Sequence, residues 1–137
     1  MKPFITKCTL LVVVLGFIIS CSSKSVLPTQ PLSNFNPEII NNTDAFQFQI
    51  TNGENVSTTV SYLWENTGTQ ATVNHSTVTD SGSAVMTVLA ADSSQVYTSG
   101  LVASANEPTT VGTTGFWVIQ LTFTNYYGTA NFRLEKL

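Results

Sequence analysis

The chain has 137 residues, of which 42% are apolar and only 9% are Asp, Glu, Lys or Arg, whereas about a quarter of an average soluble domain is charged. Five basic residues against eight acidic ones give a formal net charge of -3, which excludes the basic, phosphate-binding surface of a nucleic-acid-binding protein. The length allows one domain, and 10% aromatic residues with low net charge exclude a largely disordered chain.

The first twenty residues have the pattern of an export signal. Lys2 and Lys7 precede an apolar run of ten, residues 10–19, which is short for a bilayer-spanning helix of roughly 20 residues. The run ends in the sequence Ile-Ile-Ser-Cys, with the cysteine at position 21. This ending resembles the lipobox of bacterial lipoproteins.

The lipobox resemblance implies that residues 1–20 are a signal peptide and that Cys21 becomes the acylated N-terminus of the mature protein. The lipid would then anchor the protein to the cell envelope. Ser22 stands where an Asp would favour the inner membrane, so an outer-membrane location is expected. The alternative is an ordinary secretory signal followed by a chance cysteine. The remaining cysteine, Cys8, lies within the signal, so the mature chain is expected to have neither a disulfide nor a thiol cluster for a metal.

Residues 21–44 have the composition of a flexible tether. They contain Pro28, Pro31 and Pro37 among many Ser and Asn residues, without helical or alternating periodicity. An alternative for part of this segment is an N-terminal edge strand that contains Ile39 and Ile40. The domain proper is expected to span residues 45–137.

The remaining 93 residues, 45–137, alternate between apolar and polar positions in short runs rich in Val, Ile, Thr, Phe and Tyr, which is typical of β-strands. Turns are predicted at 52–53, 66–68, 92–94 and 125–128, the last as a hairpin turn. The run at 83–90 is apolar on both faces and is expected in the middle of a sheet. In chain order, the predicted strands are 46–51, 60–65, 70–77, 83–90, 95–97, 116–124 and 129–134.

Seven or eight strands of this length predict an all-β fold, a two-sheet antiparallel β-sandwich of jelly-roll or Ig-like type. Residues 83–135 combine a strand pattern AVMTVLAADSSQVYTSGL with a Gly-Thr-x-Gly turn into an aromatic strand. This rhythm resembles the bacterial pre-peptidase C-terminal domain and related exported jelly-roll modules. Such modules often follow a protease, and no protease is fused here, so the resemblance implies a fold rather than an activity.

No catalytic constellation is visible in the sequence. His75 and Ser76 are adjacent on a predicted strand and therefore point to opposite faces, which argues against a nucleophilic triad with Asp80. The acidic residues are scattered over predicted turns, without the clustering that calcium or a pair of catalytic carboxylates requires. We therefore expect a non-enzymatic protein without a metal or a cofactor.

Aromatic side chains are the remaining candidates for ligand contact, because exposed rings can stack on sugars while neutral amides and hydroxyls donate hydrogen bonds. Tyr126 and Tyr127 fall in the predicted hairpin turn, where one ring is expected to pack on the domain and the other to be exposed. Phe116 is expected on an outer face, next to Val118. Trp64 shares a face with core residues, with a position at the rim as its alternative.

The sequence thus predicts a non-enzymatic lipoprotein, held to the membrane by its N-terminal lipid, that binds or scaffolds a component of the bacterial envelope. One alternative is a carbohydrate-binding module for glycan or peptidoglycan, which would use Tyr126, Tyr127 and Trp64. The other is an accessory subunit of an envelope protein complex.

Overall fold

The computed structural model describes residues 27–137. The predicted signal peptide at 1–20 and the predicted acylation site Cys21 lie outside these residues. Within the described part, no helix has the length and hydrophobicity that a bilayer crossing requires.

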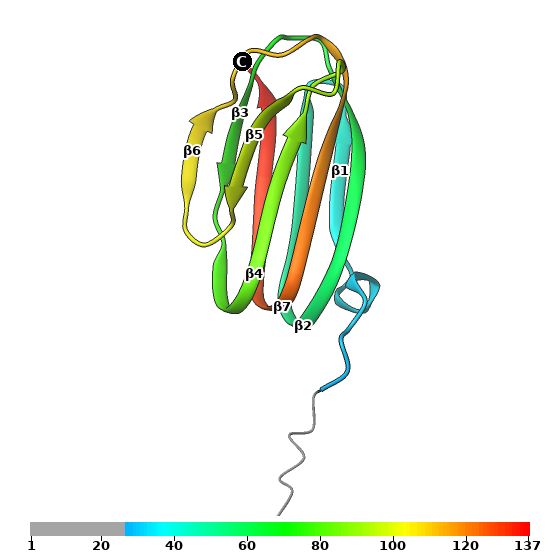
Figure 1. The fold of residues 1–137 in the computed structure, drawn as a ribbon, viewed down its shortest axis with the longest axis vertical. Coiled ribbons are helices and arrows are strands. Elements are labelled where there is room, and N and C mark those ends of the chain that lie inside the picture. Colours follow the sequence, from blue (N-terminus) through cyan, green and yellow to red (C-terminus); the bar gives the residue numbers. More distant parts are fainter. Residues whose placement is uncertain (1–26) are drawn as a thin grey trace, which may run out of the picture.

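The described residues form one short 3-10 helix and seven β-strands, so the all-β prediction is confirmed. Two of the strands, β2 and β7, are 22 residues long. Figure 1 shows the elements, which in chain order are η1 (Leu32–Phe35), β1 (Glu38–Asn42), β2 (Ala45–Asn66), β3 (Ala71–His75), β4 (Val78–Leu89), β5 (Gln95–Gly100), β6 (Ala105–Pro108) and β7 (Gly115–Lys136).

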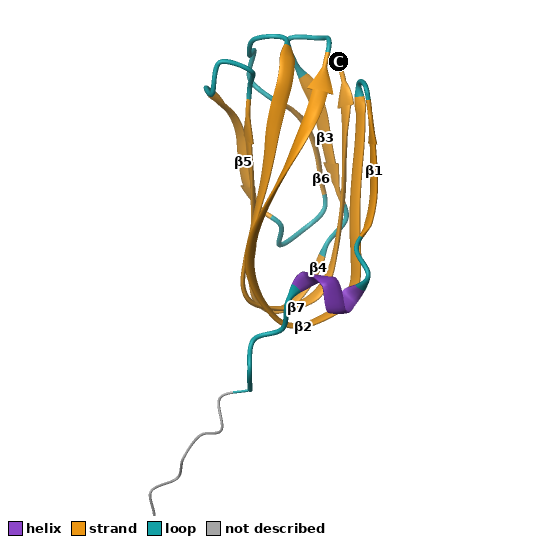
Figure 2. Ribbon diagram, turned by 90° about the vertical axis from the view of Figure 1, so that its right-hand side faces the viewer, coloured by secondary structure: helices purple, strands orange, loops and turns teal. Residues whose placement is uncertain are grey.

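The strands are arranged in two layers that are joined where the long strands bend (Figure 2). The first layer has the order β1, β2, β7, β3, β6 and uses residues 45–50 of β2 and 130–136 of β7. The second layer pairs residues 58–66 of β2 with the start of β7, followed by β4 and then β5. All strand pairs are antiparallel, as the sandwich prediction requires.

The bend is made by residues with positive φ at the point where the register shifts. In β2 these are Asn52 and Asn55, and in β7 they are Asn125 and Gly128. The predicted turns at 52–53 and 125–128 are therefore wrong as chain reversals, since both segments lie inside a continuous strand. Asn and Gly tolerate left-handed backbone, and here that tolerance turns a strand from one layer into the next.

Gly128 shows how closely the strands approach at the bend. A Cβ atom at this position would lie 2.0 Å from the carbonyl oxygen of Val78 on β4. Gly82 on β4 is similar, because its Cβ would lie 2.0 Å from the carbonyl oxygen of Asn125. The two glycines allow the bent strands β4 and β7 to lie close together.

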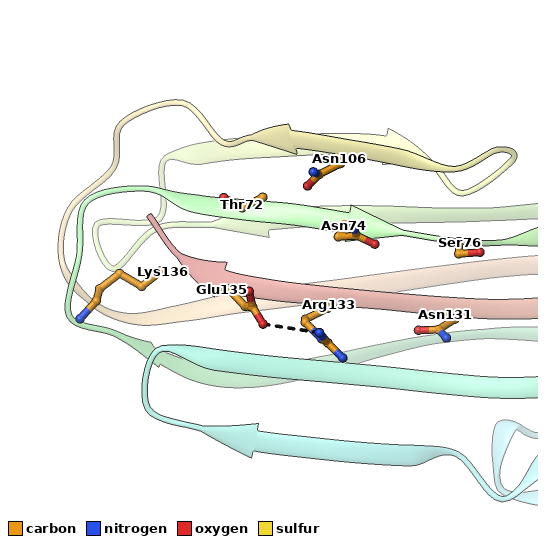
Figure 3. Close-up of a pocket in the computed structure, with 8 residues that line it drawn as sticks. All are labelled: Thr72, Asn74, Ser76, Asn106, Asn131, Arg133, Glu135 and Lys136. Atoms are coloured by element: carbon orange, nitrogen blue, oxygen red, sulfur yellow. Dashed lines mark ion pairs between the residues drawn. The ribbon is translucent and has the colours of Figure 1, made fainter.

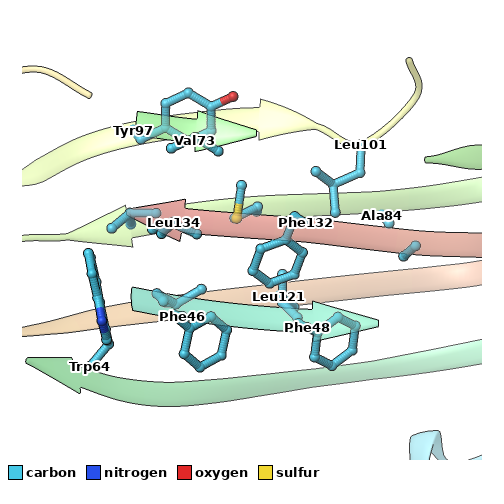
Figure 4. Packing of buried hydrophobic residues seen from close by; sticks show 14 of the residues in the cluster. Phe46, Phe48, Trp64, Val73, Ala84, Tyr97, Leu101, Leu121, Phe132 and Leu134 are labelled. Atoms are coloured by element: carbon cyan, nitrogen blue, oxygen red, sulfur yellow. The ribbon is translucent and has the colours of Figure 1, made fainter. Parts of the chain in front are cut away.

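The core lies between the two layers and consists of the inward-facing positions of the alternating strands (Figure 4). Trp64 and Trp117 are opposite each other on β2 and β7, with ring centroids 5.9 Å apart in an edge-to-face arrangement. The ring of Phe48 stacks on that of Phe132 at 5.2 Å. Because these side chains come from both layers, their burial holds the sandwich together.

Part of the predicted tether belongs to the domain. β1 pairs with β2 through five residue pairs, which confirms the alternative of an edge strand at Ile39 and Ile40. Leu32 in η1 is buried and joins the core cluster. The boundary predicted at residue 45 is therefore wrong for the described residues, because the ordered fold already includes η1 and β1.

Candidate functional site

A polar groove of about 430 Å³ lies on the outer face of the first layer (Figure 3). It crosses β3, β6 and the C-terminal half of β7. We call it the polar groove, and it is lined by Thr72, Asn74, Ser76, Asn106, Asn131, Arg133, Glu135 and Lys136. Every one of these side chains carries a hydrogen-bonding group.

Strand register places the polar side chains in rows. Asn106 on β6 is opposite Asn74 on β3, Asn74 is opposite Arg133 on β7, and Arg133 is opposite Gln47 on β2. Neighbouring strands are about 4.8 Å apart, so this row of four side chains is about 14 Å long. The row offers an extended set of hydrogen-bonding groups rather than one deep point of attachment.

Charge in the polar groove is largely compensated. The Arg133 guanidinium lies 3.6 Å from the Glu135 carboxylate and donates a hydrogen bond of 3.2 Å to the amide oxygen of Gln47. Lys136, at one end of the groove, pairs with Asp44 in the loop after β1. The groove is therefore suited to a neutral polar ligand more than to an anion.

Several side chains of the polar groove have unused hydrogen-bonding capacity. Asn131 donates to the amide oxygen of Gln49 at 3.2 Å. The side chains of Asn74, Ser76 and Asn106, in contrast, form no hydrogen bond to any other residue within 27–137, although they line the groove. Their amides and hydroxyl are free to pair with a ligand.

Two of the aromatic residues predicted as ligand contacts are in the core. Trp64 is fully buried, and its indole nitrogen donates a 3.0 Å hydrogen bond to the carbonyl oxygen of Asn42. Tyr126 is fully buried as well, with its hydroxyl donating to the carbonyl oxygen of Val78. Neither ring reaches the surface, because strand alternation turns both side chains inward.

The other two aromatic candidates are accessible but do not line the polar groove. Phe116 is 58% exposed on the outer face of the second layer. Tyr127 is half-buried at the bend and lines two hollows there, one with Phe35 and one with Asp80. The structure thus confirms that one ring of the Tyr126–Tyr127 pair packs inward while the other is accessible.

Sequence reasoning missed the polar groove. Its signal was present as alternation, because Thr72, Asn74 and Ser76 occupy every second position, as do Asn131, Arg133 and Glu135. What the sequence lacked was the pairing of β3 with β7, which are about sixty residues apart. That pairing brings the two polar faces together.

His75, Ser76 and Asp80 do not assemble into a catalytic triad. The His75 side chain is buried in the interior, and neither ring nitrogen is hydrogen-bonded to any of residues 27–137, whereas Ser76 lines the polar groove on the outside. Among residues 27–137 there is no group of three His, Cys, Asp or Glu side chains that could hold a metal ion.

Comparison with known proteins does not extend this description. No family model matches the chain, and no curated protein is significantly similar to it.

Proposed function

We propose that this protein is a non-enzymatic, lipid-anchored module of the bacterial cell envelope that binds a neutral glycan in the polar groove. The observation that carries the proposal is the row of Asn106, Asn74 and Arg133 across three strands of the outer sheet face. Amide and hydroxyl groups in such a row match the hydroxyl groups that repeat along a sugar chain.

The charge distribution supports a neutral ligand. Arg133 is paired with Glu135, and Lys136 with Asp44, so the groove has no uncompensated cation among its lining residues. A nucleic acid or another polyanion would require several free basic side chains. A glycan requires hydrogen bonds, which the unpaired amides of Asn74 and Asn106 can supply.

The surroundings of the polar groove support binding rather than catalysis. General acid-base chemistry on a sugar needs two carboxyl groups that face each other about 5 to 10 Å apart. The groove has one carboxylate, that of Glu135, and this group is paired with Arg133. The ligand would therefore be held and not cleaved.

The anchoring part of the proposal rests on the lipobox at residues 18–21. Acylation of Cys21 would hold the domain at a membrane, and the preference for the outer membrane follows from Ser22. Replacing Cys21 with Ala and measuring the membrane-bound fraction tests this part. An unchanged fraction would contradict the lipid anchor.

The glycan proposal is tested by pull-down on peptidoglycan and on a panel of neutral polysaccharides. We expect the purified mature domain to be retained, and the double variant Asn74→Ala, Asn106→Ala to bind about tenfold more weakly, because two hydrogen bonds are worth about 0.5–1.5 kcal/mol each. The matched control, Thr87→Ala with Thr98→Ala, removes a cross-strand hydroxyl pair from the opposite layer and should bind like the wild type. Failure to bind any glycan would overturn the proposal.

A second candidate function, a subunit of an envelope protein complex, is favoured by a different surface. Leu63 and Phe116 are each 58% exposed on the outer face of the second layer, where Val118 pairs with both Leu63 and Leu89. Exposed apolar groups on one face are typical of protein interfaces. A photo-crosslinking residue at Phe116 should then trap a protein in intact cells, whereas the same residue at Asn106 should not.

A further inference from the structure

Residues 27–30 are attached to β2 at the bend by hydrogen bonds. The backbone nitrogen of Gln30 donates to the carbonyl oxygen of Asn55 at 3.0 Å. The side-chain amide of Asn55 donates to the carbonyl oxygens of Leu27 and Pro28, at 2.8 and 3.1 Å. The segment therefore lies against β2 where β2 changes layers, and it leads away from that end of the sandwich (Figure 2).

An apolar hollow of about 320 Å³ lies at this attachment point. Its apolar lining comes from Leu27, Pro28, Phe35 and Tyr127. Leu27 is 64% exposed, so one edge of the hollow is an apolar side chain that is accessible from outside. We call this surface the bend-end patch.

The length of chain before Leu27 limits how far the bend-end patch can be from Cys21. Residues 22–26 separate the two positions. Six residue steps span at most about 20 Å when fully extended. An acyl chain on Cys21 would therefore hold the bend-end patch within about 20 Å of the membrane surface.

We propose that the bend-end patch is a membrane-contact surface, with Leu27, Phe35 and Tyr127 resting at the boundary between headgroups and acyl chains. The inference rests on the proposed acylation of Cys21. An aromatic ring with a hydroxyl is suited to this boundary, because its ring is apolar and its polar end stays hydrated. The contact would orient the domain with its bend toward the membrane. The polar groove would then lie on the side of the sandwich and not face the membrane.

The charges around the bend-end patch define the kind of membrane surface. Glu54 lines the patch, and Asp80 lies beside Tyr127 in the neighbouring hollow. Two carboxylates near the contact repel anionic headgroups. The patch is therefore suited to zwitterionic lipid, and an anionic bilayer should weaken the contact.

The test uses tryptophan as a depth reporter in the full-length, acylated protein. Tyr127→Trp places an indole in the bend-end patch, and Phe116→Trp places one on the exposed outer face near the opposite end of the sandwich. The native residues Trp64 and Trp117 are fully buried and supply a constant background. Each protein is reconstituted into phosphatidylcholine vesicles with or without brominated acyl chains, which quench indole emission on contact.

We expect brominated chains to cause a loss of emission in Tyr127→Trp but not in Phe116→Trp or the wild type. The loss should be smaller in vesicles rich in phosphatidylglycerol, and also when Leu27→Ser and Phe35→Ser are added to Tyr127→Trp. Equal quenching of both reporters, or none, in protein that floats with the vesicles would overturn the bend-end contact while leaving the anchor intact. Protein that does not float with vesicles would overturn the anchor and the contact together.

Discussion

The hydroxyl of Tyr97 donates a 2.8 Å hydrogen bond to the carboxylate of Glu107, and this bond joins β5 in the second layer to β6 in the first. The Tyr97 side chain is largely buried. Burial, followed by the bond to Glu107, raises the pKa of Tyr97 from 10.0 to about 12. The Tyr97–Glu107 hydrogen bond thus joins the two layers along one side of the sandwich. The Tyr97 hydroxyl loses its proton at a higher pH in the folded protein than in the unfolded chain.

This pKa shift predicts a loss of stability in alkali. A raised pKa in the folded state contributes stability that is complete below pH 10 and is lost as the pH rises through about 12. We expect the free energy of unfolding, measured with urea, to fall between these pH values by on the order of 1 kcal/mol more in the wild type than in Tyr97→Phe. Tyr127→Phe, outside this bond, should behave like the wild type. Parallel pH profiles for wild type and Tyr97→Phe would contradict the prediction.

The turn after β4 predicts that stability is also lost in acid, in contrast to the loss in alkali that Tyr97 predicts. The Asp92 carboxylate accepts hydrogen bonds from the backbone nitrogen and hydroxyl of Ser94 at 3.0 and 2.6 Å, and from the hydroxyl of Thr113 at 2.8 Å. These bonds, those from Ser94 first, lower the pKa of Asp92 from 3.8 to about 2. The stabilisation is therefore present above pH 3.8 and is lost as the pH falls through 2.

We expect Asp92→Asn to lower Tm at pH 7, and the difference from the wild type to shrink as the pH falls from 3.8 to 2. Circular dichroism melting curves at these pH values measure it. Asp80→Asn, which changes an exposed carboxylate outside this turn, should leave Tm unchanged. A Tm difference for Asp92→Asn that is constant down to pH 2 would show that the charge is irrelevant to the turn.

Much of the fold was readable from local pattern. Alternation of apolar and polar residues located the strands around Phe48, Trp64 and Trp117 and identified their buried faces, because a half-buried strand imposes a period of two on its sequence. The apolar run at 83–90 was correctly expected inside a sheet, since β4 lies between β7 and β5. The buried positions of Trp64 and Trp117 follow from the same period.

The sequence could not reveal whether the chain reverses direction at an Asn or Gly or continues as a bent strand. Asn52 and Gly128 have the residue types of a tight turn, but a left-handed residue can also bend a strand into a second layer. Only the long-range pairing of β2 with β7 decides between these outcomes. The polar groove depends on another long-range pairing, that of β3 with β7, so the candidate site was hidden for a similar reason.

The bend itself yields a prediction at Gly128. Its φ is 141°, a backbone conformation rarely adopted by other residues, and a Cβ there would lie 2.0 Å from the Val78 carbonyl oxygen. Gly128→Ala should lower the free energy of unfolding by at least about 2 kcal/mol. Gly100→Ala is the control, because the nearest atom to its Cβ is 3.4 Å away on the side chain of Val102. That control should change stability by less than about 0.5 kcal/mol, and equal effects of the two substitutions would contradict a special role for the bend.

The last prediction concerns a buried hydroxyl behind the polar groove. Thr77 is 6% exposed, and its hydroxyl has no hydrogen-bond partner among residues 27–137. A buried hydroxyl without a partner costs about 1–3 kcal/mol. Thr77→Val keeps the shape of the side chain and removes the polar group, so it should raise the free energy of unfolding by about 1 kcal/mol in urea titrations.

Thr109 provides the matched control for this prediction. It is 2% exposed, and its hydroxyl accepts a 3.1 Å hydrogen bond from the backbone nitrogen of Ala71. Thr109→Val leaves that buried nitrogen without this bond and should lower the free energy of unfolding by about 1–3 kcal/mol. The two isosteric substitutions thus have opposite expected signs, and destabilisation by Thr77→Val would mean that the Thr77 hydroxyl is hydrogen-bonded in solution.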